Sequence, residues 1–163
     1  MLPKLDEAIV EAGFIDSNGH MNIRHYLELD AAATTHLIED LGIDDSYRAE
    51  RRLGVFTAEH HLVYLSELYE GDAISVHTRV LARSDKAVHL MAFLLDRSRE
   101  RLANTLELTL VHVDMDSRRP IPMPPDVASG FDRHIASSDA ITWPAPVCGV
   151  MGVRRRPAAS TAG

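Results

Sequence analysis

The 163-residue sequence contains a single cysteine, Cys148, so no disulfide can form within the chain. So little cysteine is typical of a protein from a reducing compartment. No apolar run approaches the roughly 18 residues that a membrane-spanning helix requires. The first residues, 1–13, carry three acidic side chains in place of the apolar stretch of a signal segment. We therefore expect a soluble, cytoplasmic protein.

Positive charge is also scarce, because 17 Lys and Arg stand against 24 Asp and Glu and the net charge is -7. Proteins bind nucleic acid through clustered basic side chains, so nucleic acid is not an expected partner. There is no internal repeat, and the length suits one domain with its own core. We expect a single domain over residues 1–136 and an irregular or disordered tail over residues 137–163, which is rich in Pro, Gly, Ala and Arg.

The hydrophobic pattern predicts one long helix and several strands. Apolar residues recur at helical spacing from Ile23 to Leu41, Asn22 is a favoured N-cap, and Gly42 stands where a C-cap glycine belongs. Alternating patterns predict strands over residues 8–14, 55–65, 73–82, 87–95 and 102–114, and a short helix is expected over 126–136. Short turns favour antiparallel pairing, and the helix needs a sheet that buries its apolar stripe. The expected fold class is α+β, a curved antiparallel sheet wrapped around one long central α-helix.

The strand over 55–65 carries polar side chains that have two interpretations. Simple alternation places Phe56, Ala58 and His60 on one face, with Leu62 and Tyr64, and places Glu59 and His61 together on the other. A carboxylate beside an imidazole could orient or tune it. The alternative is a solvated or subunit-bridging polar pair.

A carboxylate, a glycine turn and a helix start follow one another between Asp16 and Asn22. The free N–H groups at a helix start can hold developing negative charge, so an acid placed there suits hydrolytic chemistry. Plainer roles stay open for each side chain. Asp16 could bond its own backbone in a turn, Asn22 could serve as a cap only, and His20 could satisfy the loop.

This stretch resembles the hotdog-fold acyl-CoA thioesterases of the 4-hydroxybenzoyl-CoA thioesterase type. The family signature Asp-x-x-Gly-His-x-Asn-x-x-x-Tyr is matched by Asp16, Gly19, His20, Asn22 and Tyr26. A Gly-Asp turn at 71–72 and the ending at 111–124 are also similar to the family. Residues 56–61, Phe-Thr-Ala-Glu-His-His, resemble the second strand of a branch that is found with carnitine breakdown and acts on betainyl-CoA.

The resemblance implies a hotdog fold and hydrolysis of a small acyl-CoA thioester to a free acid and coenzyme A, and the resemblance to the branch just named implies betainyl-CoA as the substrate. It implies that Asp16 is the catalytic nucleophile or general base. The implied substrate-binding residues are Gly19, His20, Asn22, Ile23 through its amide, Glu59 and His61. It implies no cofactor beyond the coenzyme A of the substrate, and a homodimer or dimer of dimers. The alternatives are a non-catalytic acyl-CoA-binding hotdog protein and a hotdog hydratase or dehydratase.

Further expectations concern the acyl group, metal binding, Cys148 and the C-terminal arginines. A cationic acyl group could face Glu59 or Asp30, although a structural hydrogen bond is the alternative role for Asp30. No metal is expected, because the histidine spacings match no paired-ligand pattern. Cys148 has no evident base nearby in the sequence, and the arginines at 154–156 are either contacts for coenzyme A phosphates or solvated.

Overall fold

The computed structural model describes residues 2–153, which form one antiparallel sheet and three α-helices. In chain order the elements are β1 (Lys4–Ile9), a 3-10 turn (Ala12–Phe14), α1 (Ile23–Asp40), α2 (Asp45–Arg51), β2 (Leu53–Tyr64), β3 (Ala73–Arg83), β4 (Ala87–Asp96), β5 (Arg101–Asp114), β6 (Arg119–Pro120) and α3 (Pro125–Asp139).

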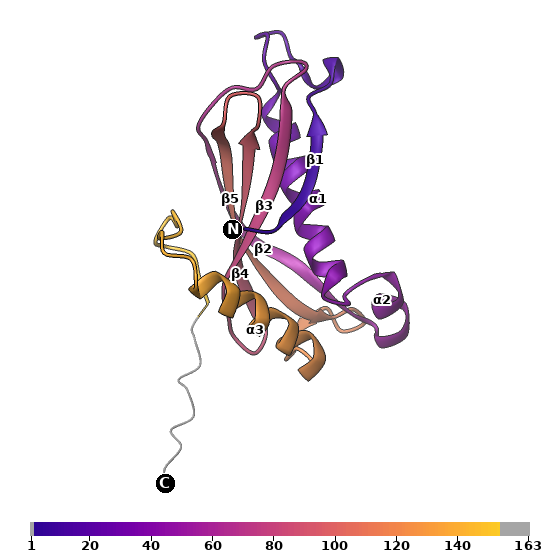
Figure 1. Cartoon of the computed structure of the whole chain (residues 1–163). Coiled ribbons are helices and arrows are strands. Elements are labelled where there is room, and N and C mark those ends of the chain that lie inside the picture. The colour runs from indigo at the N-terminus through magenta and orange to yellow at the C-terminus, as the bar shows by residue number, and fades with distance from the viewer. Residues whose placement is uncertain (1, 154–163) are drawn as a thin grey trace.

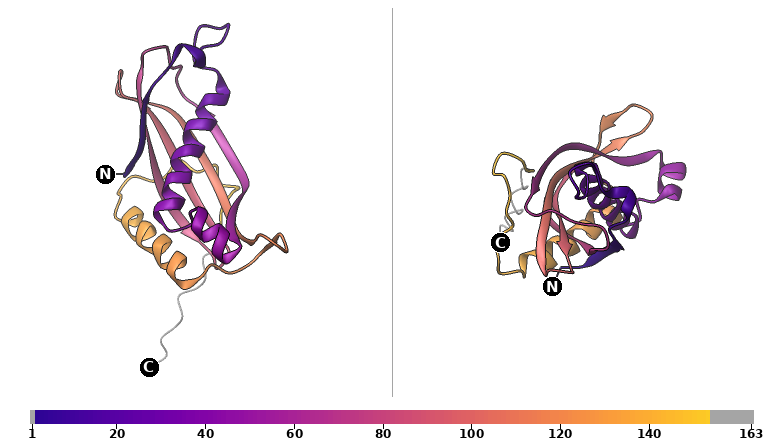
Figure 2. Two further views of the ribbon diagram at one scale, coloured as in Figure 1. Left: turned by 90° about the vertical axis from the view of Figure 1, so that its right-hand side faces the viewer. Right: turned by 90° about the horizontal axis from the view of Figure 1, so that it is seen from above.

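The sheet curls around α1, as the sequence predicts. The strand order is β1-β3-β4-β5-β2, and the short strand β6 pairs with β5. Viewed from above in Figure 2, the strands enclose α1 on several sides, and Figure 1 shows α1 against one face of the sheet. Since the order ends at β2, this strand has one edge without a partner within the described part of the chain.

Helix α1 begins and ends where its caps place it. The Asn22 side chain accepts a hydrogen bond from the Arg24 amide at 3.1 Å, and Gly42 adopts a φ of 85° just after the last turn. That backbone conformation costs glycine little, so the helix stops there. The buried side chains of α1 include Tyr26 and Leu37, and burying an apolar side chain of this size contributes about 2 kcal/mol each.

A β-bulge in β2 changes the predicted grouping of its side chains. Thr57 pairs with Leu110 but Glu59 pairs with Thr109, so Ala58 is an extra residue on β2. Because one extra residue reverses the alternation, the prediction that Phe56 and Ala58 share a face with His60 is wrong. His60 instead faces α1 with three residues that lie on that side of the sheet, Val55, Thr57 and Leu62.

The ends of the chain also differ from the prediction. The first strand is Lys4–Ile9, because residues 12–14 form a 3-10 turn. Between α1 and β2 lies the helix α2, whose start is capped by the Asp44 side chain, which accepts from the Tyr47 amide at 2.8 Å. Helix α3 runs to Asp139, three residues beyond the predicted limit of the domain, so residues 137–139 are helical and not irregular.

Residues 140–153 contain no helix or strand, and they are anchored to the outer face of the sheet, opposite α1. Arg79 donates to the carbonyl oxygens of Trp143 at 2.8 Å and Ser138 at 3.1 Å, and its guanidinium lies over the Trp143 ring. The Trp143 ring also meets Phe93 edge-on, with centroids 5.6 Å apart. Residues 154–163, including the three arginines, lie outside the described residues. The domain limits themselves stay a prediction.

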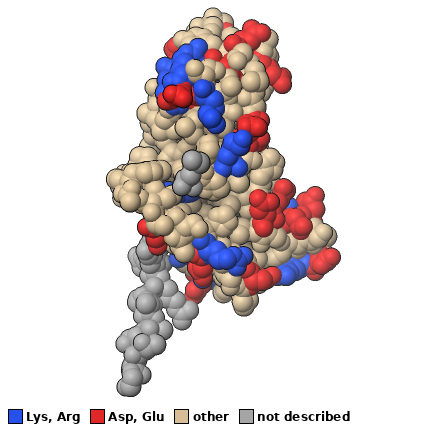
Figure 3. Space-filling model, in the orientation of Figure 1, with Lys and Arg blue, Asp and Glu red and all other residues tan. Residues whose placement is uncertain are grey.

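No helix in the described part of the chain is long and apolar enough to cross a membrane. On the face shown in Figure 3, basic and acidic side chains are interspersed and several lie side by side. Elsewhere in the described residues, Arg99 donates to both Asp72 and Asp96, whose carboxylates accept from the same guanidinium.

Candidate active site

The loop before α1 holds the Asp16 carboxylate in a defined position. One carboxylate oxygen accepts from the Asn18 amide at 2.8 Å, and the other accepts from the Asn22 side-chain amide at 3.1 Å. Gly19 turns the chain with a φ of 84°, and a Cβ there would meet no atom within 4 Å, so the space beside it is open. The hydrogen bond from Asn18 is the largest influence on the Asp16 pKa; despite opposing desolvation, the pKa lies below its ordinary value. The group is therefore an ionised base at neutral pH.

Asn22 connects this carboxylate to the helix start. Its oxygen caps α1 at the Arg24 amide while its nitrogen donates to Asp16. The Asn22 backbone amide donates to the Phe14 carbonyl at 2.9 Å and is therefore committed. Among the hydrogen bonds of the described residues none uses the Ile23 amide, so this N–H group is a free donor at the start of α1.

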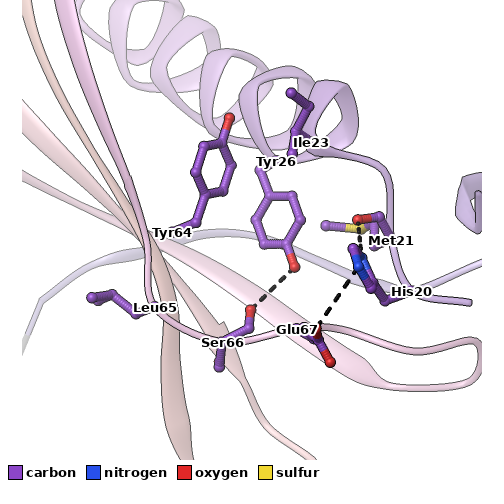
Figure 4. A pocket seen from close by; sticks show the side chains of 8 residues that line it. All are labelled: His20, Met21, Ile23, Tyr26, Tyr64, Leu65, Ser66 and Glu67. Atoms are coloured by element: carbon purple, nitrogen blue, oxygen red, sulfur yellow. Dashed lines mark hydrogen bonds and ion pairs between the residues drawn. The ribbon is translucent and has the colours of Figure 1, made fainter. Parts of the chain in front are cut away.

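A pocket of about 240 Å³ lies beside this helix start. Figure 4 shows its lining, which comes from the loop, the first turn of α1 and the end of β2 with the residues after it: His20, Met21, Ile23, Tyr26, Tyr64, Leu65, Ser66 and Glu67. The Tyr26 and Tyr64 rings meet at 90° with centroids 5.3 Å apart, and the Tyr26 hydroxyl donates to the Ser66 carbonyl at 3.1 Å. Asp16 is not part of the lining but is bonded to the loop that forms it.

The polar groups of the pocket are His20 and Glu67. In Figure 4 the His20 ring lies between the Met21 carbonyl, at 3.2 Å from Nδ1, and the Glu67 carboxylate, at 3.8 Å from Nε2. The Tyr69 hydroxyl donates to the other Glu67 oxygen at 2.6 Å. A carboxylate therefore stands at the edge of a cavity whose walls are mainly aromatic and apolar.

The structure brings together five of the seven predicted site residues and separates two. Asp16, Gly19, His20, Asn22 and Ile23 form the helix start described above. Glu59 and His61 pair with Thr109 and Glu107, and their side chains lie on the face of the sheet that is opposite α1. Within one chain they do not reach the pocket, and their assignment to the substrate stays a prediction.

Asp30 lies inside the core and not in the pocket. It is fully buried, its Oδ2 atom accepts from the Asn104 side chain at 2.8 Å, and its Oδ1 atom has no hydrogen-bond partner. Burial raises the pKa of Asp30 to about 7. The structural alternative for Asp30 thus fits its hydrogen bond to Asn104.

The pocket wall formed by Ser66 and Glu67 was not predicted from the sequence. In the structure Tyr64 and Leu65, at the end of β2 beside this wall, are 45% and 53% exposed. Exposed aromatic and aliphatic side chains of this kind often mark a binding surface.

Comparison with known proteins supports the fold and the family. The family model of the thioesterase-like superfamily matches residues 10–131. The betainyl-CoA thioesterase of Pseudomonas aeruginosa is 31% identical over 141 residues, which cover 86% of this chain and 88% of that protein. The L-carnitine dehydrogenase/betainyl-CoA thioesterase of Agrobacterium fabrum is 35% identical over 136 residues, 83% of this chain and 28% of that protein. The chain therefore spans about a quarter of the length of such longer relatives.

Solved structures show the same architecture. A Staphylococcus aureus protein in complex with CoA has a TM-score of 0.81 and 26% identity, covering 88% of this chain and 91% of that one. A structure from Pseudomonas putida has a TM-score of 0.77 and 22% identity, covering 94% of this chain and 98% of that one. The predicted hotdog fold is confirmed.

Proposed function

Because the chain belongs to the thioesterase-like superfamily, we propose that it hydrolyses an acyl-CoA thioester to a free acid and coenzyme A, with a betainyl group as the acyl part. The observation that carries the proposal is the ionised Asp16 carboxylate, which Asn22 holds beside the free amide of Ile23. The longer relatives have a further activity in their names, and the present proposal concerns thioester hydrolysis only.

In this proposal the thioester carbonyl oxygen accepts from the Ile23 amide at the positive end of α1. Such a donor stabilises the oxyanion that forms when the carbonyl carbon is attacked, and one donor contributes about 3 kcal/mol in known cases. Asp16 either removes a proton from the attacking water or attacks the carbon itself. In both routes the carbon–sulfur bond then breaks, and coenzyme A leaves as a thiolate that takes up a proton. In the second route a mixed anhydride with Asp16 remains, and water hydrolyses it to the free acid and the Asp16 carboxylate. The structure is compatible with both routes.

The pocket lining suits a trimethylammonium group. Tyr26 and Tyr64 present two perpendicular rings, and Glu67 adds a negative charge at the edge. A cation held over aromatic faces gains about 0.5–2 kcal/mol per ring. The cavity therefore supplies what a betainyl group requires, and in this proposal Glu67 is the carboxylate nearest the cation, since Glu59 and Asp30 do not line the pocket.

We also propose that the chain forms at least a homodimer in the cytoplasm. The outer edge of β2 has no partner within the described residues, and exposed edges of this length usually pair. A second β2 would extend the sheet across a two-fold axis. Light scattering should give at least twice the chain mass, and a stable monomer would contradict this proposal.

The test is release of free thiol from betainyl-CoA and from tert-butylacetyl-CoA, which has the same shape without the charge. The wild type should hydrolyse betainyl-CoA with the higher kcat/KM. Glu67→Gln and Tyr64→Leu should each reduce that preference about fivefold, mainly through KM, since the loss of one ion pair or ring contact costs about 1 kcal/mol.

A separate variant tests the proposed catalytic role of Asp16. Asp16→Asn should lower kcat for both esters at least about 100-fold, because the carboxylate can no longer act as base or nucleophile. Tight binding of an ester without any thiol release from the wild type would favour the non-catalytic alternative. Equal kcat/KM for the two esters would be consistent with the proposed thioester hydrolysis but would refute betainyl-CoA as the preferred substrate.

A further inference from the structure

Away from the pocket, three metal-ligating side chains converge on the outer face of the sheet. They are His61 of β2, Glu107 of β5 and Cys148 of the irregular C-terminal segment. Each offers one ligand atom, and these atoms all lie within 4.8 Å of one another. His61 and Glu107 are direct partners in the β2–β5 ladder, and the segment that carries Cys148 is attached to the sheet through the hydrogen bond from Arg79 to Trp143.

The Glu107 carboxylate is buried and firmly held. Its side chain is 1% exposed, its Oε2 atom accepts from the Cys148 amide at 2.7 Å, and its Oε1 atom lies 2.8 Å from His89 Nε2. Among the ion pairs of the described residues, His89 is its only partner. A buried carboxylate without a Lys or Arg partner is a common place for a metal ion to supply the missing positive charge.

The three donor atoms are an imidazole nitrogen, a carboxylate oxygen and a thiol sulfur. This set is typical of zinc, which binds all three donor types at about 2.0–2.3 Å. Tetrahedral geometry at those bond lengths separates ligand atoms by about 3.3–3.8 Å, so atoms within 4.8 Å need to approach by about one ångström. His61 is exposed and Cys148 is half-buried, so these two side chains have room to make that adjustment.

We propose that His61, Glu107 and Cys148 bind a zinc ion, with water as the fourth ligand. His89 is a positioning residue, since its Nε2 atom orients the Glu107 carboxylate. The site lies on the opposite face of the sheet from α1, and the ion would join the C-terminal segment to β2 and β5. This role differs from the substrate contact predicted for His61, and it replaces the expectation that the chain binds no metal.

The experiment uses the full chain without an affinity tag, stripped with a chelator and titrated with Zn²⁺ alone or with Co²⁺ alone. One metal ion should bind per chain, and Co²⁺ should give a thiolate-to-cobalt charge-transfer band. Cys148→Ser should remove the band, and His61→Gln should weaken binding at least about tenfold. His60→Gln is the matched control, because His60 is equally exposed but lies on the opposite face of β2.

A second readout does not depend on any variant folding. In the wild type, zinc should slow hydrogen exchange at the amides around Cys148 relative to the stripped chain. Failure of the wild type to bind a metal ion, unchanged exchange, or an equally strong site in Cys148→Ser would each overturn the proposal.

Discussion

Replacing Asp30 by Asn should stabilise the chain, and more so as the pH rises. Asp30 is buried with one oxygen unpartnered, and the facing Asn104 Oδ1 atom is also buried without a hydrogen-bond partner. An asparagine at position 30 removes the charge, keeps an acceptor for the Asn104 nitrogen, and adds an N–H group that can serve Asn104 Oδ1.

The magnitude follows from the raised pKa. The folded chain holds the Asp30 proton up to a pKa of about 7, whereas an unfolded chain releases it near the ordinary value of 3.8. Between these values the folded state binds more protons, so raising the pH lowers the free energy of unfolding by about 1.4 kcal/mol per unit. From pH 5 to pH 8 the wild type should lose about 2.5 kcal/mol from this group, and Asp30→Asn should not.

The assay is urea unfolding of both proteins at pH 5 and at pH 8, with equal protein concentrations so that any assembly affects both alike. The difference in unfolding free energy between variant and wild type should grow by about 2.5 kcal/mol over this range. A difference that stays constant or shrinks as the pH rises would refute the reasoning, because it would mean that the Asp30 pKa is not raised by folding.

Three further substitutions test the fold and the loop. Asn22→Ala should lower stability by about 1 kcal/mol in thermal unfolding through the lost helix cap, and should also lower kcat because Asp16 loses a hydrogen bond. Phe131→Ala should cost about 3–5 kcal/mol in urea unfolding, since this ring is fully buried in the core. Tyr47→Phe should cost about 1–3 kcal/mol, because the hydroxyl lies 2.8 Å from the otherwise buried His112 Nε2 atom. Unchanged stability in any of the three would show that the contact concerned contributes little.

Much of the fold and the core of the candidate site could be predicted from local sequence patterns. The cap, the glycine stop and the apolar period that define α1 all lie within its own residues, and so does the turn that presents Asp16. The ladder of long strands could be predicted because each strand alternates and the turns between them are short.

The features that were missed depend on residues distant in sequence. The irregular C-terminal segment is held by Arg79 and Phe93 of two central strands, and no pattern within the segment indicates this. The ligand atoms of His61 and Cys148 are brought together only by folding, so a search for short histidine spacings could not find them. The helix α2 did have a local signal, since Asp44 is a favoured cap followed by a charged turn.

The additional residue at Ala58 has a consequence for comparing this chain with its relatives. In a relative without this additional residue, a Glu-x-His pair aligned with Glu59 and His61 would point toward the helix, where it could approach a substrate. In a relative, the residue aligned with His61 can therefore be assigned to a face of the sheet only when its pairing partner on β5 is known, as Glu107 is for His61 here. Assigning a role to this pair across the superfamily requires a structural alignment of the two strands. The presence or absence of one residue decides whether the pair faces the helix or the outer side of the sheet.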